Sequence, residues 1–275
     1  MGTGVRYWLV HQPLISQYEW KLYQTPGATP RFVAITVAVY LALTLTLLLL
    51  HRFVAITVSS ATVRRLSALH SLALCLLSIV MAVGTLLSVL HDTPPGNPIW
   101  AICFPVGETP PRGATFFWAH VFYFSKILEF VDTLLILLGD SRNRRLSFLH
   151  VYHHAAVVVL CYLWLAKVQS LFPVALVANA AVHVLMYGYY FLCAVGRRPA
   201  WKRLVTNVQI LQFLFSFAIS GRMLHEHFFG SGCEGFQSWC FNAVFNASLL
   251  ILFFDFHSKS YAQKTRPASE KLKSI

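Results

Sequence analysis

The sequence has few charged residues and very few acidic ones. Asp, Glu, Lys and Arg together make up 12% of its 275 residues, and Asp and Glu account for only 10 positions. Soluble domains carry roughly a quarter charged residues. This scarcity, together with 57% hydrophobic residues, excludes an ordinary soluble domain. The composition instead predicts an all-α integral membrane protein, in which membrane spans leave no room for a separate catalytic domain.

Other features that the sequence lacks exclude further kinds of segment and binding function. The first 30 residues hold Arg6, Glu19 and Lys21 and contain no continuous apolar stretch, so we expect no cleavable signal peptide. The positive charge is divided among short segments, which argues against nucleic acid as a partner. We also expect no dinucleotide-binding unit, so this chain should not carry out reductions itself.

Seven apolar stretches are each long enough to cross a bilayer. They are residues 32–50, 66–90, 115–138, 146–165, 171–195, 205–224 and 236–256. Basic residues gather after the first, third, fifth and seventh stretches, so the positive-inside rule places these segments in the cytosol and the N-terminus in the lumen. We therefore predict a lumenal segment at 1–31, a seven-helix transmembrane domain at 32–257 and a cytosolic tail at 258–275.

Two cysteines fall in loops on the predicted lumenal side, Cys103 and Cys233. An oxidising compartment permits disulfides. Cys103–Cys233 is the pairing that we predict, with two free thiols as the alternative.

Three histidines, His150, His153 and His154, lie in one apolar stretch. Their spacing places them within about a 100° arc of one helix face. Imidazoles are costly in hydrocarbon unless they face a protein interior, so the group indicates a reaction centre or a metal site. Membrane di-iron desaturases and hydroxylases use three such histidine boxes, whereas this chain has one. A mononuclear metal site, a desaturase-like metalloenzyme and a seven-helix transporter remain as alternatives.

Further polar side chains lie within the predicted spans. The third stretch holds Lys126, Glu129 and Asp132, whose spacing allows an ion pair within one helix. These charges either form a salt-bridge network that fixes the bundle or orient a ligand. The other polar positions gather on two more helix faces: Asn179, His183, Tyr187 and Tyr190, and then Gln209 and Gln212.

Taken in order, these motifs resemble the fatty acid elongase (ELO) family, with details typical of its plant-type branch. They read Lys126-x-x-Glu129-x-x-Asp132-Thr133, His150-x-x-His153-His154, Asn179-x-x-x-His183-x-x-Met186-Tyr187-x-Tyr189-Tyr190 and Thr206-x-x-Gln209-x-x-Gln212. The resemblance implies a very-long-chain 3-ketoacyl-CoA synthase, in which seven helices enclose an acyl tunnel. It would join acyl-CoA to malonyl-CoA, without a cofactor or a metal.

The resemblance also implies roles for particular residues. The catalytic set is His150, His153, His154 and His183, with His153 as the nucleophile that accepts the acyl group. Substrate binding falls to two groups. The buried group is Lys126, Glu129, Asp132, Asn179, Tyr187, Tyr190, Gln209 and Gln212, and the basic group facing CoA is Arg144, Arg145, Arg197 and Lys202.

Location and partners follow from the same resemblance. Lys271 and Lys273 near the C-terminus resemble a dilysine retrieval signal, so we expect a multi-pass protein of the endoplasmic reticulum membrane. Membrane lipid surrounds such a chain. The rest of an elongation cycle requires a 3-ketoacyl-CoA reductase, a 3-hydroxyacyl-CoA dehydratase and an enoyl-CoA reductase, which we expect as partners, and a homodimer is a further expectation of the family.

Overall fold

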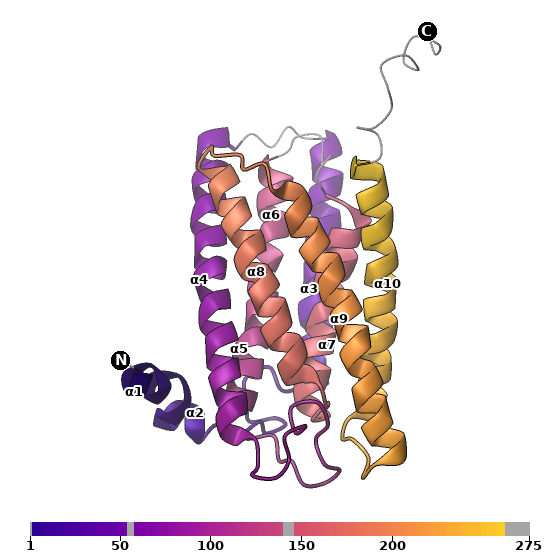
Figure 1. The fold of residues 1–275 in the computed structure, drawn as a ribbon. Helices are drawn as coiled ribbons and strands as arrows, with labels where there is room; N and C mark the ends of the chain where they lie inside the picture. The colour runs from indigo at the N-terminus through magenta and orange to yellow at the C-terminus, as the bar shows by residue number, and fades with distance from the viewer. Residues whose placement is uncertain (1, 54–57, 140–145, 262–275) are drawn as a thin grey trace.

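The long helices of this chain stand side by side in one bundle (Figure 1). This computed structural model describes residues 2–53, 58–139 and 146–261. The long helices are α3 (Pro30–Phe53), α4 (Ser60–Asp92), α7 (Phe148–Ala166), α8 (Phe172–Ala194), α9 (Lys202–Phe229) and α10 (Phe236–Tyr261). In the described ranges these six are long and apolar enough to cross a membrane. The last helix continues beyond residue 256, the predicted end of the seventh apolar stretch. Residues 258–261, which we assigned to the cytosolic tail, are therefore helical.

The third apolar stretch is the one where the prediction of a single helix is wrong. Residues 115–138 are divided between α5 (Ala114–Leu128) and α6 (Phe130–Gly139), with Glu129 between them. The backbone tightens here, because the Asp132 N–H donates to the carbonyl of Glu129, three residues earlier, at 3.0 Å. With 15 and 10 residues, neither helix reaches the roughly 20 residues needed to cross hydrocarbon alone.

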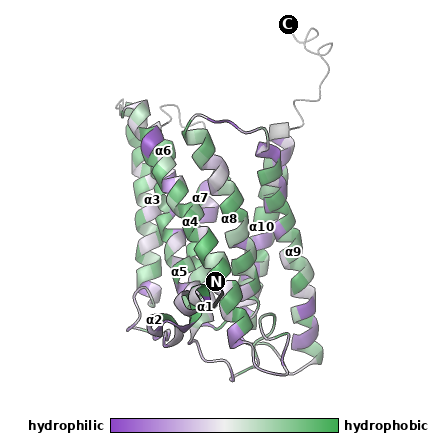
Figure 2. Cartoon of the chain, turned by 60° about the vertical axis from the view of Figure 1, so that its left-hand side comes forward, coloured by the Kyte–Doolittle hydropathy of each residue, from purple (hydrophilic) through white to green (hydrophobic). Residues whose placement is uncertain are grey.

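The long helices are predominantly hydrophobic, as the green colour in Figure 2 shows. Large side chains such as Leu69, Leu211, Val244 and Ile251 are more than 60% exposed. Apolar surface on this scale is not tolerated in water, and a bilayer satisfies it without further cost. The protein is therefore a multi-pass membrane protein.

The N-terminal segment folds against one end of the bundle. It forms three short helices, α1 (Gly2–Arg6), η1 (Tyr7–His11) and α2 (Pro13–Ser16). The indole of Trp118 on α5 donates to the carbonyl of Leu9 at 2.9 Å. Trp20 N–H donates to the carbonyl of Pro111 at 2.8 Å. These bonds join the segment to α5 and to the loop that precedes it.

That same end carries a disulfide. Cys103 and Cys233, the pair predicted from the sequence, are joined with their Cα atoms 5.0 Å apart. Glu234 reinforces the link, since its N–H donates to the carbonyl of Phe104 at 2.8 Å and its own carbonyl accepts from Ser170 N–H at 3.0 Å. We call this the disulfide end of the bundle. It ties together the loop at 93–113, the α7–α8 turn and the α9–α10 turn.

The α9–α10 turn contains the spacing Gly230-x-Gly232-x-x-Gly235, which has the letters of a dinucleotide-binding fingerprint. Such a fingerprint requires a strand before it and a helix after it. Here the long helix α9 precedes it. The glycines instead serve the turn: Gly232 and Gly235 have positive φ, and a Cβ on Gly235 would lie 2.4 Å from Gln169 Cα.

Gly84 on α4 packs directly against the indole of Trp118 on α5. A Cβ at this position would lie 2.3 Å from the indole of Trp118, which is itself held by its bond to Leu9. We expect Gly84→Ala to lower the free energy of unfolding by about 1–3 kcal/mol, because the rigid indole has no room to move. Gly221→Ala on α9 is the matched control, since open space surrounds Gly221. Thermal unfolding in detergent should show a lower Tm for the first variant and an equal or higher Tm for the second, and equal Tm values would contradict the packing described here.

Candidate active site

A charged centre lies where α5, α6 and α8 meet. Lys126 Nζ donates to Glu129 Oε1 at 2.8 Å and to Asn179 Oδ1 at 3.1 Å. His183 Nδ1 lies 3.2 Å from the same Glu129 oxygen and 3.3 Å from Lys126 Nζ. Lys126 is only 1% exposed and Glu129 only 2%. Two further polar side chains from α8 therefore surround one buried ion pair.

The position of Glu129 explains how the centre is assembled. Lys126 belongs to the last turn of α5, and Glu129 is the residue at which α5 ends and α6 begins. The tightened backbone brings both side chains to the same face, toward α8. The ring of Phe122, one turn before Lys126, covers the ammonium at 4.2 Å from its centroid. Buried ions are stable only when paired and hydrogen-bonded in this way.

His150, His153 and His154, which we call the box histidines, have three different environments. His150 Nε2 lies 2.9 Å from the hydroxyl of Thr133, which in turn lies 3.0 Å from the hydroxyl of Tyr40 on α3. His154 Nδ1 faces Glu129 Oε2 at 4.0 Å, which is beyond hydrogen-bond distance. Neither this nitrogen nor this carboxylate oxygen has a hydrogen-bond partner among the described residues.

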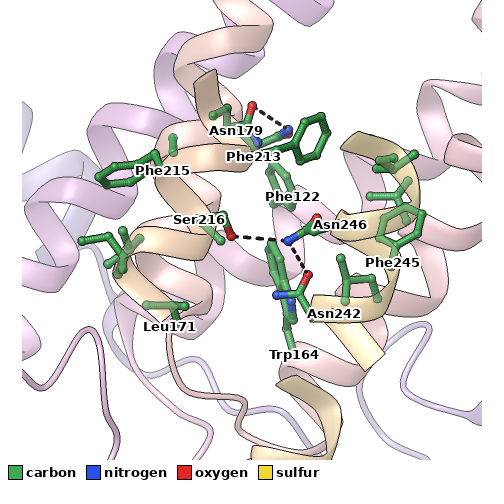
Figure 3. Close-up of a pocket in the computed structure, with 18 of the residues that line it drawn as sticks. Phe122, Trp164, Leu171, Asn179, Phe213, Phe215, Ser216, Asn242, Phe245 and Asn246 are labelled. Carbon is green, nitrogen blue, oxygen red and sulfur yellow. Dashed lines mark hydrogen bonds between the residues drawn. The ribbon is translucent and has the colours of Figure 1, made fainter. Parts of the chain in front are cut away.

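His153 differs from both neighbours because it lines a cavity whose walls come from α5, α7, α8, α9 and α10. Figure 3 shows most of the side chains that line this cavity. The cavity has a volume of about 60 Å³. Asn179 and Gln212 line it as well, with Asn179 Nδ2 lying 3.5 Å from Gln212 Oε1. The remaining walls are mostly apolar, including Phe122, Val157, Leu160, Trp164, Leu171, Val174, Phe213, Ile219 and Leu249. His153 and these two amides thus share the cavity with a long apolar wall.

Asp132 connects the site to α4 and makes a further contact with α8. Its Oδ2 accepts a hydrogen bond from the Tyr187 hydroxyl at 2.7 Å, and its Oδ1 lies 3.3 Å from His70 Nε2 on α4. Sequence reasoning singled out Asp132 and Tyr187 but missed His70 and Tyr40. Both lie far from the motifs in sequence, and neither belongs to a recognisable spacing. A polar residue within an apolar span was the only signal available.

Other predicted residues lie apart from this centre. Tyr190 is 44% exposed, and its ring centroid lies 6.0 Å from that of Tyr187. Gln209 Nε2 donates to Met186 Sδ at 3.4 Å. Arg197 and Lys202 are exposed around the α8–α9 turn, at the end of the bundle opposite the disulfide. Arg144, Arg145, Lys271 and Lys273 lie outside the described residues.

The arrangement of the His, Cys, Asp and Glu side chains can be compared with that of a metal-binding site. Within the described ranges, no group of three or more His, Cys, Asp or Glu side chains is arranged to hold a metal ion. His150 is engaged by Thr133, and His183 by Lys126 and Glu129. Both imidazoles therefore already contact other side chains of the site.

Comparison with known proteins adds an independent finding. Residues 25–269 match the ELO family, described as the GNS1/SUR4 family. The chain is 29% identical over 276 residues to "Fatty acid elongase 3-like" of Arabidopsis thaliana, covering 96% of this chain and 94% of that protein. It is 30% identical over 259 residues to "Fatty acid elongase A" of Dictyostelium discoideum, covering 91% and 90%. It is 33% identical over 210 residues to "Very long chain fatty acid elongase 2" of Mus musculus, covering 74% and 68%.

Proposed function

This chain belongs to the ELO (GNS1/SUR4) family and has a role in fatty acid elongation, and we propose that it is the condensing enzyme. In this proposal it joins a long-chain acyl-CoA to malonyl-CoA and forms a 3-ketoacyl-CoA, with release of CO₂ and CoA. The relatives are named as elongases of fatty acids, which supports elongation as the process.

The observation that carries the proposal is the position of His153. Of the three box histidines, it is the one that lines the apolar cavity, whereas His150 pairs with Thr133 and His154 faces Glu129. An imidazole is a competent acyl acceptor when it is neutral and placed beside the thioester. An acyl chain seated along the apolar wall would bring its carbonyl carbon to this ring.

The first half-reaction is then an acyl transfer. The imidazole of His153 attacks the thioester carbonyl, a C–N bond forms and the C–S bond breaks. The imidazole proton leaves with the sulfur as CoA–SH. Asn179 and Gln212 are placed to hold the carbonyl oxygen through their amide N–H groups.

The second half-reaction uses malonyl-CoA. Its C–C bond breaks, CO₂ departs, and the electron pair remains as an enolate. The enolate carbon attacks the acyl carbonyl, the C–N bond breaks, and the imidazole recovers a proton from water or a neighbouring group. His183 is the proposed enolate stabiliser: with its Nδ1 accepting from Lys126 Nζ, the neutral ring carries its proton on Nε2, which can donate to the enolate.

The charged centre supports both steps. The 4.0 Å gap between His154 and Glu129 is short enough to close with a small side-chain shift, and catalytic hydrogen bonds commonly tighten only when substrate binds. Closure would give His154 a partner for its proton. His150 is oriented by Thr133 and Tyr40, which fixes the ring while protons move.

The membrane arrangement completes the proposal. α5 and α6 together are proposed as the seventh crossing, because α6 continues from α5 toward the opposite end of the bundle (Figure 1). The N-terminus is then lumenal and the end carrying Arg197 and Lys202 is cytosolic, where CoA phosphates arrive. We further propose residence in the endoplasmic reticulum membrane and association with the reductases and dehydratase that process the product. No cofactor is required for this chemistry.

An intact-mass experiment tests the covalent route. The purified wild-type protein is incubated with palmitoyl-CoA alone, and the expected result is a mass increase of one palmitoyl group with release of free CoA. Adding malonyl-CoA should remove the adduct and produce the 3-keto product. If CoA appears only when malonyl-CoA is present and no adduct forms, the acyl-imidazole is wrong and a ternary complex takes its place.

A further inference from the structure

The apolar wall of the cavity is interrupted by three neutral polar side chains. Asn242 and Asn246 lie one turn apart on α10, and Ser216 lies opposite them on α9 (Figure 3). Asn246 Nδ2 donates to Ser216 Oγ at 3.3 Å and to Asn242 Oδ1 at 3.1 Å. We call Ser216, Asn242 and Asn246 the polar patch.

The patch does not satisfy its own hydrogen-bonding capacity. Both of its internal bonds use the same donor, Asn246 Nδ2. They leave Asn242 Nδ2 and Asn246 Oδ1 unused, although Asn242 is only 3% exposed. Trp164, which is 4% exposed and lines the same cavity, has an indole N–H without a partner in the described part of the chain. A plain alkyl chain would leave the indole N–H unpaired and would offer the two amide groups no partner, which is unfavourable in a buried site.

The patch lies close to the reacting end of the cavity. Ser216 follows Gln212 by one turn of α9, about 6 Å along the helix axis. Asn246 follows Phe245, whose ring centroid lies 6.3 Å from that of His153. A group held by the patch would therefore sit within a few carbons of the thioester.

The chemistry of the patch selects the kind of group. It offers an N–H donor on Asn242 and a carbonyl acceptor on Asn246, and a hydroxyl can use both at once because it donates one hydrogen bond and accepts others. The cavity lining, drawn from the described residues, contains no Lys or Arg, so a carboxylate would be buried without a counter-charge. A double bond offers neither a strong donor nor a strong acceptor.

We propose that the polar patch recognises a hydroxyl group on the acyl chain, within a few carbons of the thioester, so that hydroxylated acyl-CoAs are substrates of this enzyme. The proposal rests on the proposed function, since the cavity must hold the acyl chain. It assigns the patch a role in substrate choice that neither the histidine box nor the charged centre performs.

A competition experiment tests it. The protein is given palmitoyl-CoA mixed with palmitoyl-CoA carrying one hydroxyl group, at each successive carbon in turn, together with malonyl-CoA. The two products are quantified by mass, so their ratio reports relative kcat/KM and does not depend on the amount of folded protein. We expect one hydroxyl position to be preferred by roughly tenfold, since a site built to bond a hydroxyl discriminates against the analogue that lacks it.

Variants connect the preference to the patch. Asn242→Leu should abolish the preference, and the smaller change Ser216→Ala should reduce it. Asn207→Leu is the matched control, because Asn207 is an exposed amide of α9 outside the cavity, and it should keep the preference of the wild type. A preference that survives Asn242→Leu, or equal use of every substrate, would show that the patch only joins α9 to α10 or holds water, and the inference would be wrong. Absence of condensation with any substrate would instead overturn the proposed function, and this inference with it.

Discussion

Replacing His153 with alanine should abolish the acyl adduct and lower turnover by at least about a thousandfold, the scale expected when a covalent nucleophile is removed. The variant should still fold. His153 is not part of the ion pair of Lys126 and Glu129, and the described hydrogen bonds of the site do not depend on its side chain. The measurement is incorporation of labelled malonyl-CoA into longer acyl chains, together with intact mass after incubation with palmitoyl-CoA.

A second histidine variant separates the two half-reactions. His183→Asn should still form the adduct on His153, because the first step does not involve His183. It should then consume the adduct slowly when malonyl-CoA is added, since the enolate loses its hydrogen-bond donor. An adduct on His153→Ala, or none on His183→Asn, would reverse the roles that we propose for these residues.

Replacing Lys126 with methionine should destabilise the protein by about 3–5 kcal/mol, because Glu129 would remain buried without its counter-charge. The side chains are similar in length, so loss of packing volume contributes little. Asn179 and His183 would lose a shared donor at the same time. Thermal unfolding of the detergent-purified variant should show this loss as a large fall in Tm.

The double variant Lys126→Met with Glu129→Gln provides the control for charge. Removing both charges eliminates the uncompensated ion, so most of the lost stability should return. Activity should not return, because methionine at position 126 cannot donate to His183 Nδ1, the bond that keeps the ring proton on Nε2. If the double variant is as unstable as Lys126→Met alone, packing rather than charge explains the effect. If it is fully active, the charged centre serves only to fix the bundle.

The charged centre illustrates how far sequence reasoning reaches. The spacing of Lys126 and Glu129 predicted an ion pair within one stretch, and the two side chains are 2.8 Å apart. The sequence left two roles open for that pair, a salt bridge that fixes the bundle or a group that orients a ligand. Spacing along one helix does not reveal which side chains of another helix approach it. The contacts with Asn179 and His183 depend on where α8 packs, which only the folded bundle determines.

The box histidines also show that spacing predicts a shared helix face but not the contacts of each side chain. Helical geometry predicted that His150, His153 and His154 share a face, and their rings do lie close, with centroids of His150 and His154 4.3 Å apart. Their separate environments were beyond prediction. His150 is distinguished by its contacts with Thr133 and Tyr40, and His153 by its place in the lining of a cavity.

The break at Glu129 was also beyond sequence reasoning. Residues 115–138 are apolar enough to be interpreted as one helix, and no Pro or Gly interrupts them. The break coincides with a tightened turn, in which Asp132 N–H bonds the carbonyl of Glu129 three residues earlier in the chain. That tightening accompanies the burial of Lys126 and Glu129 against α8, which is a tertiary effect.

The disulfide between Cys103 and Cys233 makes the two ends of the bundle unequal in their freedom to move. Helices joined at one end can only widen the bundle by tilting about that end, so displacement grows along their length. For the 28 residues of α9, which span about 42 Å, a tilt of about five degrees moves the far end by roughly 4 Å. The cavity should therefore widen toward the end with Arg197 and Lys202 and stay closed beside Leu171, so that a long chain enters and leaves by the same route.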